Sequence, residues 1–173
     1  MEDSLQLHGV TPPNSVEAER SVLGAMLQDS GAVLQAAEEL EENDFYTPAH
    51  REIFSGMIQL HRNQSPVDLV TVDAELSRRG SLEGVGGTAY LIELSQYVPT
   101  TANVKAYIRI VLEKSTLRKL IRASNEISQE CYSQQNPLQE TLNHAEKSIF
   151  DIVMHRASGE SLVHVKEVLY HTY

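Results

Sequence analysis

Between Ala102 and Gln134 the chain contains neither glycine nor proline, the two residues that interrupt helices most strongly. A segment of this length without either residue predicts one long helix. At 1.5 Å per residue, its 33 residues would form a rod about 50 Å long. The rest of the molecule must therefore accommodate a helix far longer than a small globular domain needs.

A second long helix is predicted directly after this rod. Asn136 and Pro137 mark its start, and the apolar residues that follow are four and three residues apart, as in a helix that lies along another helix. Two long helices joined by a short turn form an antiparallel helical hairpin. Because the small domain before it cannot cover such a hairpin fully, its remaining apolar face predicts self-association. The candidate residues are Leu138, Leu142, Ala145, Ile149 and Ile152.

The residues before the rod predict a small domain of short helices. Asn14 and Glu17 have the spacing of a capping box. Thr47 followed by Pro48 suits a helix start, and Gly80 suits the left-handed conformation after a helix end. The chain also has no tryptophan and few runs of β-branched residues, which favours helix. The predicted fold class is all-α.

The C-terminal residues predict a flexible link and one more helix. The sequence ASGES, residues 157–161, reads as the link, and a short amphipathic helix follows it. A helix this short is marginal in water, so its apolar side needs a surface to pack on. That side carries Leu162, Val165, Val168 and Leu169. The predicted organisation is a globular domain over residues 1–100, the hairpin over 101–156, and the linker region over 157–173.

The glycine-rich stretch GSLEGVGGTAYLIELSQYVP, residues 80–99, raises the question of a nucleotide site. A phosphate-binding loop of the Walker type needs a lysine and a hydroxyl residue after its last glycine, but Gly87 is followed by Thr88 and Ala89. A dinucleotide-binding turn would need a preceding buried strand, and none is predicted. We therefore expect Gly84, Gly86 and Gly87 to start a helix, and we predict no cofactor site.

No other pattern indicates catalysis or metal binding. The seven histidines form no H-E-x-x-H pair. His50 falls at the third helical position after Thr47 and is interpreted as a structural residue that helps to satisfy the free N–H groups there. The single Cys131 excludes an internal disulfide and a multi-cysteine zinc site. No nucleophile elbow of the G-x-S-x-G type is present. The sequence predicts neither catalytic residues nor a metal site.

The charge distribution argues against DNA binding by the first part of the chain. The net charge is −10, with −11 in residues 1–100 and +1 in residues 101–173. An acidic surface repels phosphates, so little or no direct DNA binding is expected. A basic stripe on the long helix leaves two alternatives open, pairing with acidic neighbours or direct DNA contact, and the first is favoured. Its members are Lys105, Arg109, Lys114, Arg118, Lys119 and Arg122.

The hydropathy pattern predicts a cytoplasmic protein. No run of residues reaches the roughly 18 apolar positions that a membrane-spanning helix requires. The N-terminal sequence MEDSLQLHGV is acidic and lacks the basic start and apolar core of a signal peptide.

Five segments in order resemble the N-terminal half of the bacterial replicative DNA helicase, the DnaB family, from about Pro12 to Tyr173. They are PPNSVEAERSVLGAMLQD, DFYTPAHREIFSGMIQL, SPVDLVTVDAEL, VGGTAYLIELSQYVPTTANVKAYIRIVLEKSTLRKLI and VKEVLYHTY. The resemblance implies an all-α domain, a hairpin through which domains pair, and a linker helix that packs on a neighbouring subunit's motor domain. It also implies a homo-oligomer, either a dimer or a hexamer built as a trimer of dimers, that docks primase and is acted on by a helicase loader.

The resemblance assigns no catalytic residue to this chain. In that family the ATP and magnesium sites, the arginine finger and the DNA-binding loops belong to a motor domain beyond these residues. The chain then represents a non-catalytic collar of an ATP-dependent helicase, and it reads as an excised fragment. The alternatives are a complete, free-standing regulator or adaptor that binds a helicase ring, and a DNA-binding module.

Overall fold

The computed structural model describes the backbone of residues 10–170 and the side chains of residues 10–154. Within residues 10–170 all regular secondary structure is helical, which confirms the predicted all-α class. The chain divides into two compact units: Asn14–Ser115, and Met1–Pro13 together with Thr116–Tyr173. The helix α6 belongs to both units, since the division falls within it.

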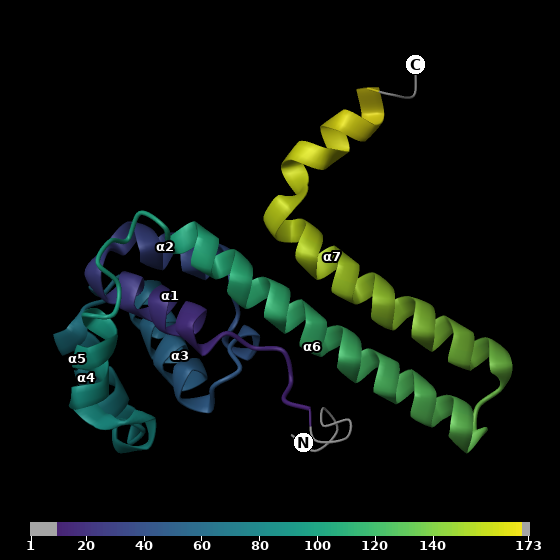
Figure 1. The fold of residues 1–173 in the computed structure, drawn as a ribbon, viewed down its shortest axis with the longest axis horizontal. Coiled ribbons are helices and arrows are strands. Elements are labelled where there is room, and N and C mark those ends of the chain that lie inside the picture. Colours follow the sequence, from purple (N-terminus) through teal and green to yellow (C-terminus); the bar gives the residue numbers. More distant parts are fainter. Residues whose placement is uncertain (1–9, 171–173) are drawn as a thin grey trace. The chain divides into compact units, whose positions relative to one another are not determined.

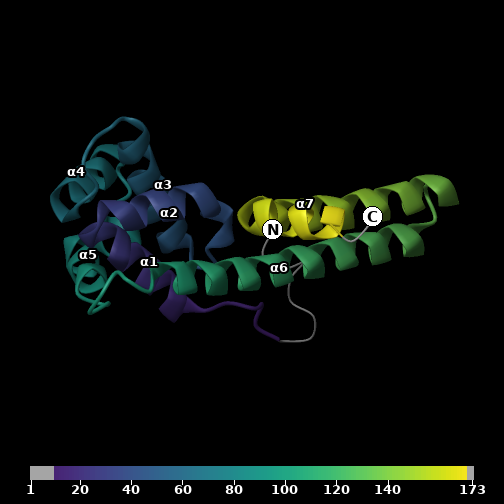
Figure 2. The same cartoon turned by 90° about the horizontal axis from the view of Figure 1, so that it is seen from above.

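Figures 1 and 2 show the helices in two views. The elements are α1 (Val16–Gln28), α2 (Ser30–Glu39), η2 (Glu42–Asp44), α3 (Pro48–Arg62), α4 (Leu69–Arg79), η3 (Glu83–Val85), α5 (Gly87–Ser95), α6 (Val104–Ser133) and α7 (Leu138–Tyr170). Elements η2 and η3 are single 3₁₀ turns.

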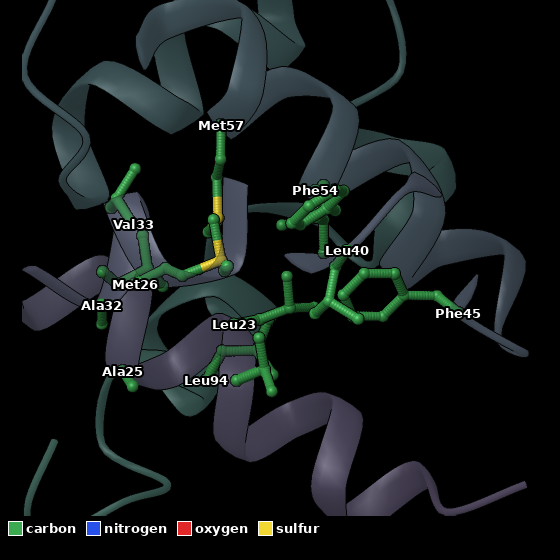
Figure 3. Close-up of a cluster of buried hydrophobic side chains, with 14 of the residues drawn as sticks. Leu23, Ala25, Met26, Ala32, Val33, Leu40, Phe45, Phe54, Met57 and Leu94 are labelled. Carbon is green, nitrogen blue, oxygen red and sulfur yellow. The ribbon is translucent and has the colours of Figure 1, made fainter. Parts of the chain in front are cut away.

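The core of the unit Asn14–Ser115 is built around α1, which packs against α2, α3 and α5. Met26 of α1 and Met57 of α3 point toward each other, and Leu23 lies near Phe45 (Figure 3). These side chains have no exposed surface. The Phe45 and Phe54 rings pack at a centroid distance of 4.8 Å. Because dense apolar packing of this kind is the main stabilising term in folding, α1 is the helix on which this unit depends most.

The first part of α6 belongs to the same core. Val104, Ile108 and Val111 are buried in it. At the end of this stretch the hydroxyl of Ser115 donates a 2.6 Å hydrogen bond to the buried carboxylate of Asp44. The compact unit therefore includes the first three turns of α6. The domain division predicted after residue 100 stays a prediction.

The helix starts are placed partly as predicted. The capping residue of α1 is Ser15, whose hydroxyl accepts a hydrogen bond from the Ala18 backbone N–H at 3.3 Å. The capping box expected from Asn14 and Glu17 was therefore wrong by one residue: the extended backbone of Ser15 (φ −145°) puts the cap there. Thr47 does precede α3, with Pro48 at its first position.

The glycine stretch starts a helix, as predicted. Gly86 has φ +107° and Gly87 has φ +70°, and α5 begins at Gly87. A Cβ atom on Gly86 would also lie 2.9 Å from the Cβ of Tyr90. The left-handed turn thus needs glycine for both its backbone conformation and its space. Gly80 likewise takes the left-handed conformation after α4, at φ +72°.

The C-terminal helix differs from the prediction at the expected link. Residues 157–161 are part of α7, which continues to Tyr170 without interruption. The physical reason is that a single glycine in a helix interior costs only about 1 kcal/mol, and the neighbouring alanine and glutamate favour helix. The predicted packing residues Leu162, Val165, Val168 and Leu169 lie outside the side chains that the structure describes.

Candidate interaction surface

The hairpin formed by α6 and α7 carries the residues predicted for self-association. The two helices run side by side in opposite directions in both views (Figures 1 and 2). α6 ends at Ser133 and α7 begins at Leu138, so the turn between them is short. Gln134 in this turn takes φ +51°, the left-handed conformation that commonly ends a helix.

One carboxylate joins the two arms at the tip of the hairpin. Glu130, in the last turn of α6, accepts hydrogen bonds from the Asn136 side-chain amide (2.9 Å) and the Thr141 hydroxyl (3.1 Å). The Nδ1 atom of His144 lies 2.7 Å from its other oxygen. The bonds from Asn136 and His144 hold the pKa of Glu130 below its usual range. The carboxylate is therefore the charged form at neutral pH.

The exposure of α7 side chains separates two faces of the helix. Thr141, Ala145, Ser148 and Ile152 are half-buried and share one face by helical spacing. Since Thr141 bonds to Glu130 of α6, this half-buried face is the one turned toward α6. Two of the five predicted self-association residues, Ala145 and Ile152, lie on it.

The other three predicted residues lie beside this face, on the adjoining and more exposed flank of α7. Leu138, Leu142 and Ile149 are 75%, 53% and 39% exposed. Val153, four residues beyond Ile149, continues the same row and is 56% exposed. We call these four residues the outer stripe: Leu138, Leu142, Ile149 and Val153.

Sequence reasoning missed Val153 and its exposed neighbours Phe150 and Met154. A strict alternation of four and three residues passes from Ile149 to Ile152, which belongs to the inner face. The spacing of four from Ile149 to Val153 was present in the sequence. Nothing in the sequence said which of the two rows would meet α6, however, because that depends on how the arms are rotated.

The basic stripe predicted on α6 is not one uniform surface. Lys105 and Arg109 are exposed, but Arg118 is buried and donates a 2.7 Å hydrogen bond to the Pro13 carbonyl oxygen. Lys114 lies 3.9 Å from the carboxylate of Glu113. The residues therefore face different surroundings, and the preference for pairing with acidic neighbours over DNA contact stays a prediction.

The unit Asn14–Ser115 contains a buried hydrogen-bond network that has a structural role. His50 lies with Nδ1 2.6 Å from Glu19 and Nε2 2.7 Å from the Tyr90 hydroxyl. Glu19 also accepts hydrogen bonds from the backbone N–H groups of Tyr46 and Thr47, just before α3. Burial raises the pKa of Glu19, but the bonds from His50 and these backbone groups outweigh it and lower the pKa overall.

This hydrogen-bond network confirms that His50 is structural, but for a reason that differs from the predicted one. The sequence suggested that His50 helps to satisfy N–H groups at the start of α3, whereas Glu19 of α1 does so. The imidazole instead links α1 to α5 through Glu19 and Tyr90. The side chains of Glu19, His50 and Tyr90 thus all have hydrogen-bond partners, as buried polar groups require.

A shallow groove of about 310 Å³ lies along α3 and α4 and is lined by Leu60, Pro66 and Ala74 among others. Glu75 at its edge is engaged by hydrogen bonds from Arg78 and Arg79, which lower its pKa to about 2. Within the described residues, no group of three histidine, cysteine or acidic side chains could hold a metal ion. No described helix is long and apolar enough to cross a membrane.

The described part of the chain is thus an all-helical unit followed by a long helical hairpin that carries an exposed apolar row. Residues 11–113 match the family described as the DnaB-like helicase N-terminal domain. The chain belongs to this family, as its resemblance predicted.

Two curated relatives are similar over most of the chain. The replicative DNA helicase DnaB of Geobacillus stearothermophilus is 44% identical over 162 residues, and the replicative DNA helicase DnaC of Bacillus subtilis is 41% identical over 162 residues. In both cases the match covers 94% of this chain and 36% of the relative. The chain thus spans about a third of the length of these helicases.

Two solved structures share the fold. The N-terminal domain of DnaB helicase from Mycobacterium tuberculosis matches with a TM-score of 0.77 and 40% identity, covering 82% of this chain and 99% of that one. A DnaB-like replicative helicase, whose structure was described with its interactions with primase, matches with a TM-score of 0.67 and 26% identity, covering 92% of this chain and 36% of that one.

Proposed function

We propose that this chain is the non-catalytic N-terminal collar of a hexameric replicative DNA helicase. In this role it organises the subunits and provides a docking surface for primase during DNA replication. The observation that carries the assembly role is the outer stripe, a row of exposed aliphatic side chains along one arm of the hairpin. The family match and the replicative helicase relatives support the helicase assignment.

Self-association through the hairpin follows from the cost of leaving this row in water. Burying an exposed leucine, isoleucine or valine contributes on the order of 1–3 kcal/mol. A second copy presents the same row, and two identical rows cover each other about a twofold axis. We propose dimers as the first step and a trimer of dimers as the hexameric collar.

The remaining assignments concern partners and a part of the protein beyond these residues. Primase docking is supported by the relative whose structure includes its interactions with primase. A helicase loader is proposed to act on the same ring. ATP and magnesium are proposed to bind a motor domain outside this chain, and DNA unwinding is the activity of the whole helicase. The named relatives are replicative helicases, which does not favour a free-standing regulator.

Sedimentation equilibrium tests the assembly role. The double variant Leu142→Asp with Ile149→Asp places two charges on the outer stripe, and we expect it to lower the association constant at least about a hundredfold. The matched control is Gln129→Asp with Asn143→Asp, which adds the same charge at exposed polar positions, one on each arm. Equal association by the parent chain and both variants would remove the proposed assembly role.

Calorimetric titration with the helicase-binding domain of the cognate primase tests the docking role. We expect saturable binding by the parent chain and by the control variant, and loss of binding by the stripe variant, if docking uses the assembled hairpin. Absence of heat with the parent chain, at concentrations where it is associated and folded, would contradict docking by this region alone.

A further inference from the structure

The hairpin tip contains a cluster of polar side chains that the outer stripe does not explain. Glu130 lies in the last turn of α6, which has no basic residue. A carboxylate there faces the negative end of its own helix, which is unfavourable by itself. Its side chain is nevertheless only 14% exposed and accepts three hydrogen bonds.

The three donors come from successive parts of the hairpin. Asn136 lies in the turn, Thr141 in the first turn of α7 and His144 in the next. Thr141 and His144 are three residues apart, so both reach the same carboxylate from one face of the helix. The first turn of α7 also offers the positive end of its dipole to this negative charge. One side chain of α6 thus fixes both the conformation of the turn and the rotation of α7.

The rest of the inner face defines the pairing of the arms only weakly. Besides Thr141 it presents Ala145, Ser148 and Ile152, of which only Ile152 is a large apolar side chain. Small residues form a smooth surface, and a shift by one helical turn would exchange one small residue for another. A directional contact is needed where apolar packing does not select a single register.

We infer that Glu130 is a clasp that fixes the register and rotation of the hairpin arms, and that this sets the direction in which the outer stripe faces relative to α6. The inference rests on the proposed self-association for its consequence, but the clasp itself concerns a single chain. Removing the carboxylate lets α7 rotate or slide along α6, which turns or shifts the outer stripe as a whole, because its residues keep their places on α7. Association then weakens, although no residue of the stripe has changed, because the stripe no longer meets a second copy in one fixed orientation.

The two carboxylate oxygens of Glu130 have different partners, so a conservative substitution affects them differently. Asn136 and Thr141 both donate to Oε1 of Glu130, and His144 faces Oε2. In Glu130→Gln the amide oxygen still serves the first two donors, and the amide N–H₂ group faces His144. A neutral imidazole can accept that N–H, but a protonated one cannot.

Glu130→Gln is therefore the conservative variant. It keeps the acceptor for Asn136 and Thr141, so it is expected to weaken the clasp less than Glu130→Ala, which removes all three contacts.

The test measures the register within one chain. Nitroxide labels on Cys131 and on a cysteine introduced as Lys147→Cys report the distance between the arms, with labelled chains diluted in unlabelled ones. We expect Glu130→Ala to broaden this distribution and Glu130→Gln to broaden it less. The matched control Glu126→Ala removes the same charge from an exposed position one turn away and should leave it narrow.

Sedimentation equilibrium on the same variants measures the consequence. Glu130→Ala is expected to lower the association constant about tenfold, the effect of roughly one lost charged hydrogen bond. If the parent chain does not associate, the proposed assembly fails, and the label distances alone decide the clasp. A narrow distribution in Glu130→Ala, equal to that of Glu126→Ala, would overturn the inference.

Discussion

Gly24 shows how one residue sets the distance between two helices. It lies in the middle of α1, and a Cβ atom at this position would overlap the carbonyl oxygen of Leu94 in α5. Because the obstructing atom belongs to the backbone, it cannot turn aside as a side chain would. The close approach of α1 and α5 therefore depends on the absence of a side chain, and not on the conformational freedom of glycine.

Replacing this glycine tests the close approach. We expect Gly24→Ala to lower the free energy of unfolding by about 1–3 kcal/mol, although alanine is the better helix former. The control is Gly84→Ala, because a Cβ atom on Gly84 would have nothing within 4 Å. Urea unfolding followed by circular dichroism measures both, and equal stability of the two variants would contradict the steric explanation.

Glu19 makes the stability of the globular unit depend on pH. Its pKa is lowered in the folded protein from the ordinary value of 4.5. A lowered pKa means that the ionised carboxylate stabilises the fold above pH 4.5, and that this contribution is lost as the pH falls through the folded-state pKa.

We expect Glu19→Gln to lower the free energy of unfolding at pH 7 by about 2 kcal/mol, a typical value for a buried hydrogen-bonded charge. The difference from the parent chain should shrink as the pH falls from 4.5 through the lower folded-state pKa, below which Glu19 is neutral in the folded protein as well. Glu17→Gln, on the exposed side of the same helix, is the control. A difference that stays constant between pH 7 and pH 3 would contradict this account.

At the scale of helices, the two starts that the sequence marks most clearly are built differently. Ser15 caps α1 with its own hydroxyl, whereas Thr47 makes no side-chain cap bond and Glu19 of another helix accepts from its backbone N–H. At the start of α1 a backbone N–H group is thus satisfied by a side chain next to it in the sequence, and just before α3 one is satisfied by a side chain from another helix.

Alanine substitution separates the two kinds of cap. Ser15→Ala is expected to lower the free energy of unfolding by about 1 kcal/mol, as loss of an N-cap does. Thr47→Ala keeps the backbone N–H that Glu19 accepts, so its effect should stay within about 0.5 kcal/mol. Thermal and urea unfolding give both values, and a larger loss for Thr47→Ala would show that its hydroxyl matters after all.

In the whole molecule, α6 takes part in both the globular core and the hairpin. Its first three turns complete the core through Val104, Ile108 and Val111, and the rest forms an arm of the hairpin. Since these buried residues follow the predicted domain end at residue 100, they decide where a chain can be cut without losing the fold.

A chain of residues 14–115 should therefore unfold cooperatively by itself. A shorter chain of residues 14–103 lacks the three core residues and the bond from Ser115 to Asp44. We expect it to be less stable by about 4 kcal/mol or more, from the apolar burial alone. Differential scanning calorimetry compares the two, and an equally sharp transition in the shorter chain would show that residue 100 is the true end of the domain.

The sequence by itself determined the all-helical class, the long hairpin, the family and the glycine turn before α5. The family follows from the resemblance of five ordered segments. The other three follow from periodicity, from the absence of helix breakers over a long stretch, and from backbone conformations that few residues adopt, all of which are local properties.

The tertiary structure decided what local patterns leave open. Ala145 and Ile149 lie on neighbouring parts of the same helix surface, yet Ala145 is half-buried and Ile149 is exposed, because the rotation of α7 depends on contacts with α6. Likewise, no spacing links Glu19 to His50, 31 residues later, since burial brings them together. Periodicity identifies the apolar residues of a helix, but only the packing of the folded chain determines which of them are buried.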